Sequence, residues 1–321
     1  MSAPAHGVTA DPASPAPVLS YGPVTLSVPG RPVDLQLRVS APETGTALPV
    51  ILLSHGHGGS NHLSSLHGYA PLADLWAAAG FVVVQPTHLS SGTLRHRLAD
   101  APGAPLFWRS RAEDMSRILD RLDEIESTVP HLDGRVDHGR IAVAGHSMGG
   151  HTAALLLGAR TADPDSGSEV DLAEPRIRAG VLLAAPGRGG DVLNGPMAPL
   201  VSFLDTIDYT TMTTPALVVA GDKDDPRHFT DIGPDWHADA YALAPAPKTL
   251  LTLFGAEHLL GGVSGYDAAE TTDENPERVA ALAHLAAAYL RTQLHPGDNS
   301  WHTATTALTT GPHAVGRVES K

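Results

Sequence analysis

A ten-residue stretch, IAVAGHSMGG over residues 141–150, constrains the fold of this chain more than any other. Apolar residues of strand type run directly into the pattern G-x-S-x-G around Ser147, and an alanine- and leucine-rich segment of helical character follows. In such a strand–turn–helix unit the serine occupies a tight turn, and its hydroxyl projects above the sheet. Gly145 and Gly149 carry no Cβ where the strand and the helix crowd together. The stretch therefore predicts a serine nucleophile at the carboxyl end of a buried strand.

The remainder of the chain repeats apolar runs and helical segments. Near-continuous apolar runs are typical of strands buried on both faces of a parallel sheet, and they occur at residues 48–54, 81–84, 141–144, 179–185, 216–220 and 248–254. Helical spacing of apolar residues predicts helices at residues 69–79, 107–125 and 276–294. Alternating residues at 21–28 and 33–40 predict an antiparallel N-terminal hairpin. We therefore expect an α/β fold with a mostly parallel, doubly wound sheet.

The domain organisation follows from the distribution of these patterns over 321 residues. One catalytic domain is expected over residues 18–294, since the chain has no internal repeat and no shift in amino-acid composition that would mark a second domain. Residues 1–17 are rich in Ala, Pro and Ser and are expected to form a disordered arm. Residues 295–321 are expected to form a polar, poorly ordered tail. The long irregular segments 86–105 and 186–213 are expected to border the site, because long loops in compact domains are often functional.

Charge and composition narrow the classes of partner and compartment. A net charge of −14 with neutral histidines argues against a nucleic-acid partner and against an anionic membrane surface. The absence of cysteine excludes disulfides, thiolate zinc sites and a cysteine nucleophile. No apolar run approaches the length of a membrane span, so stable membrane insertion is not expected. The N-terminal residues lack a basic start followed by an apolar stretch, which favours a cytoplasmic protein.

Partners for the serine are sought at the ends of other strands. A serine hydroxyl becomes a nucleophile only when a base removes its proton and a third group orients that base. His258 follows the last apolar run, and Asp224 follows the run before it. Carboxyl ends of parallel strands share one sheet edge, so these side chains and Ser147 are expected to meet. Asp222 and Asp225 lie in the same turn as Asp224 and stay open as alternatives for the acid.

The glycine-rich segment SHGHGGS at residues 54–60 follows another buried strand. Its backbone N–H groups are expected at the carboxyl end of that strand, where ligands gather in open α/β sheets. His55 and His57 also form an H-x-H pair of the kind found in metal sites, but no acidic residue or third histidine follows nearby. We therefore interpret the segment as an oxyanion-hole loop. No metal or cofactor is expected, and a chelator is predicted not to inhibit.

Two more histidines lie close to the serine in sequence. His146 precedes Ser147 in the tight turn, so its ring is expected to point away from the hydroxyl. His151 lies on the helix that follows. Both are interpreted as packing or hydrogen-bonding residues.

Together these motifs resemble those of serine α/β-hydrolases, in the branch with platelet-activating-factor acetylhydrolases, chlorophyllases, dienelactone-hydrolase-like esterases and bacterial polyester hydrolases. The resemblance covers about residues 20–294 and rests on four motifs: SHGHGG at 54–59, GHSMGG at 145–150, Gly221-x-x-Asp224, and GAEH at 255–258. It implies the α/β-hydrolase fold and a triad of Ser147, Asp224 and His258. The family spacing, three residues after the glycine, favours Asp224 as the acid. The resemblance also implies an oxyanion hole formed by the N–H groups of His57 and Met148.

The activity implied by the resemblance is hydrolysis of a small carboxylic ester through an acyl-enzyme, without a cofactor. The chain lacks the leader and the cysteine pair of secreted polyester hydrolases, which argues against a polymer substrate. An amidase or peptidase with the same triad is the alternative among enzymes. A non-catalytic binding protein on the hydrolase fold is the alternative outside them. An intact Ser–Asp–His set argues against that last alternative, because binding alone does not require all three residues.

Overall fold

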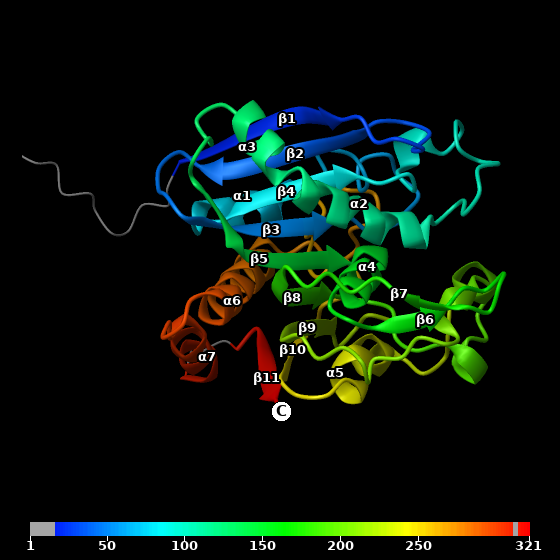
Figure 1. Ribbon diagram of the computed structural model, residues 1–321. Helices are drawn as coiled ribbons and strands as arrows, with labels where there is room; N and C mark the ends of the chain where they lie inside the picture. The colour runs from blue at the N-terminus through cyan, green and yellow to red at the C-terminus, as the bar shows by residue number, and fades with distance from the viewer. Residues whose placement is uncertain (1–16, 311–313) are drawn as a thin grey trace, which may run out of the picture.

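The computed structural model describes residues 17–310 and 314–321, and its centre is a nine-stranded sheet (Figure 1). Across the sheet the strand order is β1-β2-β4-β3-β5-β8-β9-β10-β11. Neighbours from β4 to β10 pair in parallel, whereas β1 with β2, β2 with β4, and β10 with β11 pair antiparallel. The strands are β1 (Val18–Leu26), β2 (Leu35–Pro42), β3 (Leu48–Ser54), β4 (Val82–Thr87), β5 (Val136–His146), β8 (Ile177–Leu183), β9 (Ala216–Gly221), β10 (Lys248–Leu253) and β11 (Gly316–Ser320). An α/β architecture with a mostly parallel sheet and an antiparallel N-terminal hairpin is therefore confirmed.

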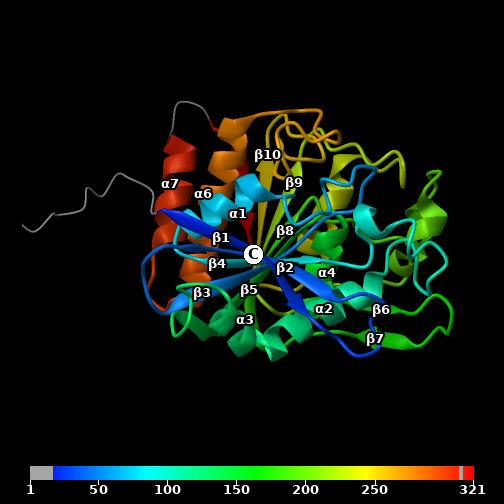
Figure 2. The same cartoon turned by 90° about the horizontal axis from the view of Figure 1, so that it is seen from above.

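Helices cover both faces of the sheet. They are α1 (Ala70–Ala78), α2 (Trp108–Asp120), α3 (Leu122–Thr128), α4 (Met148–Leu156), α5 (Asp239–Leu243), α6 (Pro276–Leu294) and α7 (Ser300–Thr310). Seen from above, α1, α6 and α7 lie on one side, and α2 and α3 on the other (Figure 2). Short 3-10 turns η1 (Gly92–Leu94), η2 (Gly190–Val192), η3 (Ala198–Leu204) and η4 (Pro234–Ala238) and the small strand pair β6 (Arg160–Ala162) and β7 (Glu169–Asp171) lie in the connections. Within the described residues, no helix has the length and apolar character needed to cross a bilayer.

Each central strand supplies side chains to two separate cores. On β3, Val50 and Leu52 join the core that faces α2, α3 and α4, whereas Ile51 and Leu53 join the core under α1 and α6. All four side chains are at most 1% exposed. Burying an aliphatic side chain of this size stabilises a fold by about 1.5–3 kcal/mol. This two-sided burial explains why the β3 segment reads as a continuous apolar run.

Helix boundaries differ from the sequence prediction at one place. The helix expected over residues 107–125 is two helices, α2 and α3, because Arg121 has the non-helical φ of −123° and ψ of 25°. The Arg121 guanidinium donates to the carboxylate of Glu124 and to the carbonyl oxygen of Ser27. These hydrogen bonds hold the junction between α2 and α3 next to Ser27, which follows β1.

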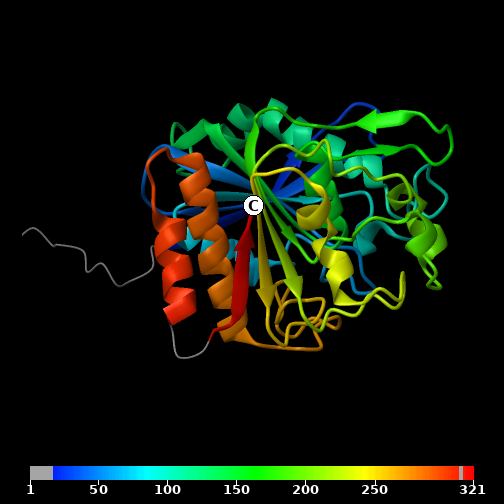
Figure 3. The ribbon, with the colours of Figure 1, turned by 90° about the horizontal axis from the view of Figure 1, so that it is seen from below.

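The C-terminal segment also differs from the prediction, because its described residues, 295–310 and 314–321, include a helix and a strand instead of a poorly ordered tail. Helix α7 packs on α6, where the Trp301 ring meets Tyr289 edge-on with 5.4 Å between ring centroids. Strand β11 then lies beside β10 at the edge of the sheet (Figure 3), with Val318 opposite Leu251. The prediction failed because an edge strand with one apolar residue shows no alternating pattern, and threonines dilute the apolar face of α7.

The disordered arm expected at residues 1–17 lies outside the described residues, apart from Pro17. The carbonyl oxygen of Pro17 accepts the N–H of Glu43 at 2.8 Å, next to the start of β1.

The parallel pairing of β3, β5, β8, β9 and β10 brings their carboxyl ends to one edge of the sheet. The segments that follow β3, β5, β9 and β10 contain the residues singled out from the sequence. The candidate site is therefore located at this edge.

Candidate active site

Ser147 occupies a strained turn between β5 and α4. Its φ of 54° and ψ of −120° lie in a region that non-glycine residues rarely adopt, at a cost of about 1–3 kcal/mol. The Ser147 N–H donates to the carbonyl oxygen of Leu183 on β8 at 2.8 Å, which fixes the turn to the sheet. A Cβ at Gly145 would lie 2.0 Å from the Gly149 oxygen, and a Cβ at Gly149 would lie 2.0 Å from the Ser54 oxygen. Both glycines are therefore required for the turn to close.

The structure brings Ser147, His258 and Asp224 into one hydrogen-bonded chain. His258 Nε2 lies 3.0 Å from Ser147 Oγ. His258 Nδ1 lies 2.9 Å and 3.1 Å from the two carboxylate oxygens of Asp224. The Asp224 side chain is 3% exposed and the His258 side chain is 40% exposed. The imidazole thus stands between the serine and a buried carboxylate, with one nitrogen toward each.

The three acidic residues in the turn after β9 have different surroundings. Asp222 Oδ1 accepts the N–H of Gly255 at 2.7 Å, and Asp225 pairs with the guanidinium of Arg227. Only Asp224 faces the imidazole. Burial alone would raise the pKa of Asp224, but the attraction of the neighbouring His258 ring outweighs it and holds that pKa far below its usual range. Asp224 is therefore ionised at all ordinary pH values.

His146 and Tyr69 connect the histidine to the loop after β3. The Tyr69 hydroxyl accepts the Gly56 N–H at 3.0 Å and donates to His146 Nδ1 at 2.8 Å. His146 Nε2 then donates to the carbonyl oxygen of His258 at 2.7 Å. Burial, together with repulsion from His258, lowers the pKa of His146 to about 3, so its ring is neutral. His146 is thus a hydrogen-bonding residue that positions the His258 backbone.

The N–H groups of His57 and Met148 have no hydrogen-bond partner among the described residues. Met148 is the first residue of α4, so its N–H carries the partial positive charge of a helix N-terminus. His57 follows β3, whose last residue pairs in register with Gly145 of β5. Both free donors therefore border the turn that presents Ser147, as an oxyanion hole requires.

A buried arginine holds the loop that follows β3. Arg111 of α2 is fully buried, and its guanidinium donates to Thr152 Oγ1 at 3.1 Å and to the hydroxyl of Ser90. It also donates to the Ser54 hydroxyl and to the carbonyl oxygen of His55. Burial lowers the pKa of Arg111 to about 10, so the group stays charged at neutral pH. The loop after β3 is thereby tied to α2 and α4.

The outer end of the same loop is held by two more side chains. Glu270 accepts the Ser60 N–H at 2.7 Å and the Ser60 hydroxyl at 2.8 Å. Arg95 donates to the carbonyl oxygens of Gly58 and Gly59 at 2.9 Å and 3.2 Å. Contacts from three distant parts of the chain therefore fix the backbone around His57.

Of the H-x-H pair in this loop, His55 is held by protein contacts, whereas His57 Nδ1 is buried without a hydrogen-bond partner among the described residues. His55 Nδ1 donates to the Gly56 carbonyl oxygen at 2.6 Å, and its Nε2 accepts the His88 N–H at 3.2 Å. Burial, helped by Arg111, lowers the pKa of His55 far below its usual value. The same causes, with Arg95, lower the pKa of His57 to about 4. Both rings are therefore neutral near pH 7.

His237 lies next to the hydrogen-bonded chain of Ser147, His258 and Asp224, and it was missed in the sequence analysis. It lies on η4, and its Nε2 is 3.3 Å from Asp224 Oδ2, although the two atoms do not form a hydrogen bond. His237 Nδ1 donates to the carbonyl oxygen of Ala185 at 2.9 Å. The other histidine near the serine, His151, packs against both Trp108 and Phe203. The sequence around His237 contains no motif that predicts its place in the site, because His237 approaches Asp224 only through the fold of the segment between β9 and α5.

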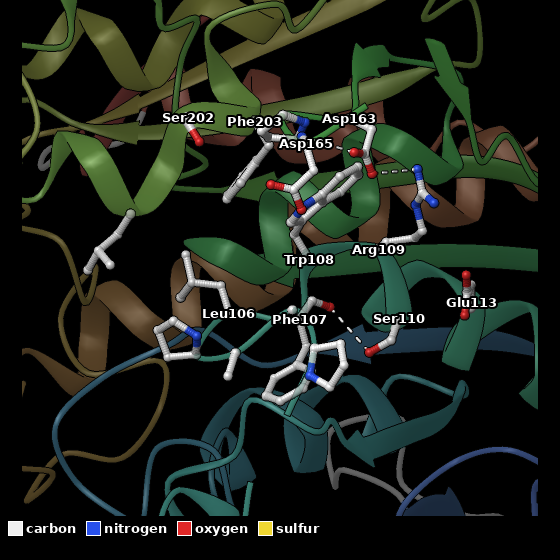
Figure 4. A pocket seen from close by; sticks show the side chains of 16 residues that line it. Leu106, Phe107, Trp108, Arg109, Ser110, Glu113, Asp163, Asp165, Ser202 and Phe203 are labelled. Carbon is white, nitrogen blue, oxygen red and sulfur yellow. Dashed lines mark hydrogen bonds and ion pairs between the residues drawn. The ribbon is translucent and has the colours of Figure 1, made fainter. Parts of the chain in front are cut away.

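Two hollows border this edge of the sheet. One of about 210 Å³ lies beside His57 and has a largely apolar wall formed by Leu89, Leu98, Ala99, Ala104, Pro105 and Phe107. A larger one of about 490 Å³ lies between the start of α2 and η3, where Trp108 stacks on Phe203 with 5.5 Å between centroids (Figure 4). The irregular segments 86–105 and 186–213 thus supply walls to these hollows. Neither hollow is lined by Ser147 or His258.

No protein-family model matches the chain, and no curated protein sequence matches it. The interpretation of the site rests on its geometry.

Proposed function

We propose that the chain is a serine α/β-hydrolase that cleaves a small carboxylic ester through an acyl-enzyme. The observation that carries the proposal is the single hydrogen-bonded chain from Ser147 Oγ through both His258 nitrogens to the buried Asp224 carboxylate. The arrangement matches the roles of nucleophile, base and orienting acid in hydrolases of this type. A non-catalytic protein has no need for a strained serine turn, a buried acid and two free N–H donors at one place.

The fold supports the same proposal. The nucleophile turn joins a central parallel strand to a helix, as the G-x-S-x-G motif of α/β-hydrolases requires. Serine, acid and histidine follow one another along the chain in the order that this class of enzyme uses. The antiparallel hairpin at one edge of the parallel strands agrees with the resemblance in sequence.

The reaction follows from the roles of these residues. His258 Nε2 accepts the proton of Ser147 as Oγ attacks the ester carbonyl carbon, while the Asp224 carboxylate stabilises the imidazolium. The N–H groups of His57 and Met148 bind the oxyanion of the tetrahedral intermediate. His258 then protonates the leaving alcohol. Water repeats the cycle on the acyl-enzyme and releases the acid.

The hollow beside His57 supports a small apolar group as part of the substrate. Its volume of about 210 Å³ is below the range of about 300–1,000 Å³ that drug-sized ligands occupy. Leu89, Leu98 and Phe107 supply apolar walls. Short-chain p-nitrophenyl esters are therefore the substrates of choice for a first assay.

The proposal is tested with a Ser147→Ala variant and a fluorophosphonate probe. Native protein is expected to hydrolyse p-nitrophenyl esters and to take up one probe molecule at Ser147. The variant is expected to lose about a millionfold in turnover while keeping its circular dichroism spectrum. Retained turnover in a pure variant, or no adduct on native Ser147, would overturn the proposal. Faster cleavage of matched anilides than of esters would favour the amidase alternative.

A further inference from the structure

His237 is a buried histidine next to the triad that has no part in the proposed reaction. Its ring is 4% exposed, and its Nδ1 lies 2.9 Å from the carbonyl oxygen of Ala185. A carbonyl oxygen can only accept, so Nδ1 carries the proton of the neutral ring. The lone pair of Nε2 is therefore unused, and this atom has no hydrogen-bond partner within the part of the chain that the structure describes.

This free lone pair lies beside two other potential metal ligands. One atom each of His237, Asp224 and His258 lie within 4.8 Å of one another. Asp224 Oδ2 is 3.3 Å from His237 Nε2 and 2.9 Å from His258 Nδ1. Neighbouring ligand atoms of a tetrahedral zinc ion are separated by about 3.3 Å, because zinc–nitrogen and zinc–oxygen bonds are about 2.0–2.2 Å long. The two separations from Asp224 Oδ2 are thus close to those in a zinc site, and the two histidine nitrogens lie within 4.8 Å of each other.

The chemistry of the three ligands also suits zinc. Two imidazoles and one carboxylate form a donor set that zinc commonly takes, with a fourth position left for water. Histidines that bind metals usually donate their other ring N–H to a carbonyl or carboxylate oxygen, which fixes the tautomer. The bond from His237 to Ala185 supplies this support before any ion arrives. His258, with a side chain that is 40% exposed, offers the route by which an ion enters.

We propose that zinc binds between His237, Asp224 and His258 and inhibits the hydrolase reversibly. Zinc takes the lone pair of His258 Nδ1, so the ring proton must move to Nε2, with solvent water as carrier. No net proton is gained or lost by the ring. His258 Nε2–H then faces Ser147 Oγ and cannot accept the proton of the serine. The inhibition rests on the proposed function, whereas the binding of zinc does not.

A second cluster serves as the comparison. Asp123, Glu126 and His138 also lie close enough to share an ion. The Glu126 carboxylate, however, already accepts the backbone N–H of Arg135 and of Val136, and it pairs with His138 Nε2 at 2.8 Å. The Glu126 carboxylate oxygens therefore already have hydrogen-bond partners, whereas His237 Nε2 has none among the described residues. A His138→Gln variant therefore controls for zinc bound at the surface.

The test measures zinc binding and ester turnover on the full chain after treatment with EDTA and removal of the chelator. Calorimetry is expected to show one zinc ion bound per chain, and turnover is expected to fall with the same concentration dependence and to return when EDTA is added. Magnesium at equal concentration is expected to have no effect, because it prefers oxygen ligands. No zinc binding at concentrations up to about 1 mM would overturn the proposal.

Variants locate the ion. His237→Phe keeps an aromatic ring against Trp236 but removes the ligand, and it is expected to weaken zinc binding at least about tenfold. His138→Gln is expected to bind zinc as the native protein does. Equal zinc affinity and equal inhibition in His237→Phe and native protein would contradict the proposed site.

The Ser147→Ala variant separates this inference from the proposed function. It keeps all three ligands, so it is expected to bind zinc with native affinity although it lacks turnover. If native protein binds zinc through His237 but shows neither turnover nor labelling at Ser147, the zinc site stands and the proposed function fails. If turnover is present and zinc does not bind, the proposed function stands and the zinc site fails.

Discussion

The orientation of His258 depends on one carboxylate. Asp224 holds Nδ1 with both of its oxygens, so the proton of the neutral ring stays on Nδ1 and the lone pair of Nε2 faces Ser147. Asp222 instead accepts a backbone N–H, and Asp225 pairs with Arg227 at the surface. These different surroundings predict different effects for the same chemical change at three neighbouring positions.

Asp224→Asn is expected to lower the turnover rate by about four orders of magnitude, because the amide stabilises the wrong tautomer of His258. Asp222→Asn and Asp225→Asn are the matched controls and are expected to change turnover by less than about tenfold, because neither carboxylate faces His258. Steady-state kinetics on a p-nitrophenyl ester measures all three variants. If Asp222→Asn or Asp225→Asn lost most turnover while Asp224→Asn kept nearly native turnover, the orienting acid would be that other residue and not Asp224.

A second residue-scale prediction concerns Tyr69, which connects the loop after β3 to His258 through His146. Tyr69→Phe leaves the Gly56 N–H and His146 Nδ1 unpaired in a buried place, at a cost of about 1–3 kcal/mol. We expect kcat to fall about tenfold, because a shift of His57 or His258 weakens transition-state contacts, while KM changes little. Tyr21→Phe on the exposed surface of β1 is the control. Native kcat in Tyr69→Phe would show that the network does not position the site.

Residues of the site differ in how far the sequence could predict them. Ser147 follows from a local motif, and His258 follows from its place after a strand. Asp224 was favoured only by the spacing known from similar proteins. Tyr69 and His237 carry no local signal, because Tyr69 reaches His146 across 77 positions and His237 reaches Asp224 through an irregular loop. A tertiary contact of this kind becomes visible only once the backbone is known.

At the scale of elements, the close packing of β3, β5 and α4 determines where Ser147 lies. Gly149 lies where a side chain would meet the Ser54 carbonyl oxygen at 2.0 Å, and Gly145 lies where one would meet Gly149. The atoms in the way are backbone atoms, so they cannot rotate aside. The strained backbone at Ser147 persists because β5 and α4, on either side of it, are each fixed by packing in the core.

Gly149→Ala is therefore expected to displace α4 from β3, to lower stability by about 1–3 kcal/mol and to abolish most turnover. Gly59→Ala is the matched control, because a Cβ at Gly59 would meet no atom within 4 Å. Thermal unfolding followed by circular dichroism measures the first effect, and ester turnover measures the second. Equal melting temperatures for the two variants would mean that this packing is looser than its geometry indicates.

Strands buried on both faces were predictable from sequence, whereas the C-terminal edge strand β11 was not. The β3 run at residues 48–54 has the bounds that its apolar residues predict, because every side chain in it is buried. Strand β11 instead forms at the edge against β10, with exposed or partly exposed residues along most of its length. Its pairing is supplied by backbone hydrogen bonds, which leave no pattern in the side chains. Helix α7 was missed for another reason, because its threonines dilute the apolar face.

At the scale of the whole molecule, the buried ammonium of Lys248 makes folding stability depend on pH. Lys248 begins β10 and is 1% exposed, and its ammonium donates to the carbonyl oxygens of Pro245 and Pro247 at 3.1 Å and 3.3 Å. No carboxylate pairs with it among the described residues. Burial, with repulsion from Lys321, lowers the pKa of Lys248 from 10.5 to about 8. The folded state therefore holds this proton less tightly than the unfolded chain does.

The sign of the pH effect follows from this difference in proton binding. Below about pH 8 both states are protonated, so folding buries an ammonium and loses its full hydration. Between about pH 8 and 10.5 the folded state releases the proton first, so this contribution to stability becomes more favourable as pH rises. Above that range both states are neutral, and the destabilising contribution of the charge disappears.

Lys248→Met is accordingly expected to raise the free energy of unfolding at pH 7 by about 1–2 kcal/mol. This is less than the about 3 kcal/mol that corresponds to the full pKa shift, because the variant also loses two hydrogen bonds to carbonyl oxygens. Lys223→Met, at an exposed lysine, is the control and is expected to change stability by less than about 0.5 kcal/mol. Urea unfolding at pH 7 and pH 10 measures the difference, which should shrink at the higher pH. A Lys248→Met variant that is less stable than native protein at pH 7 would show that the two carbonyl bonds outweigh the cost of burying the charge.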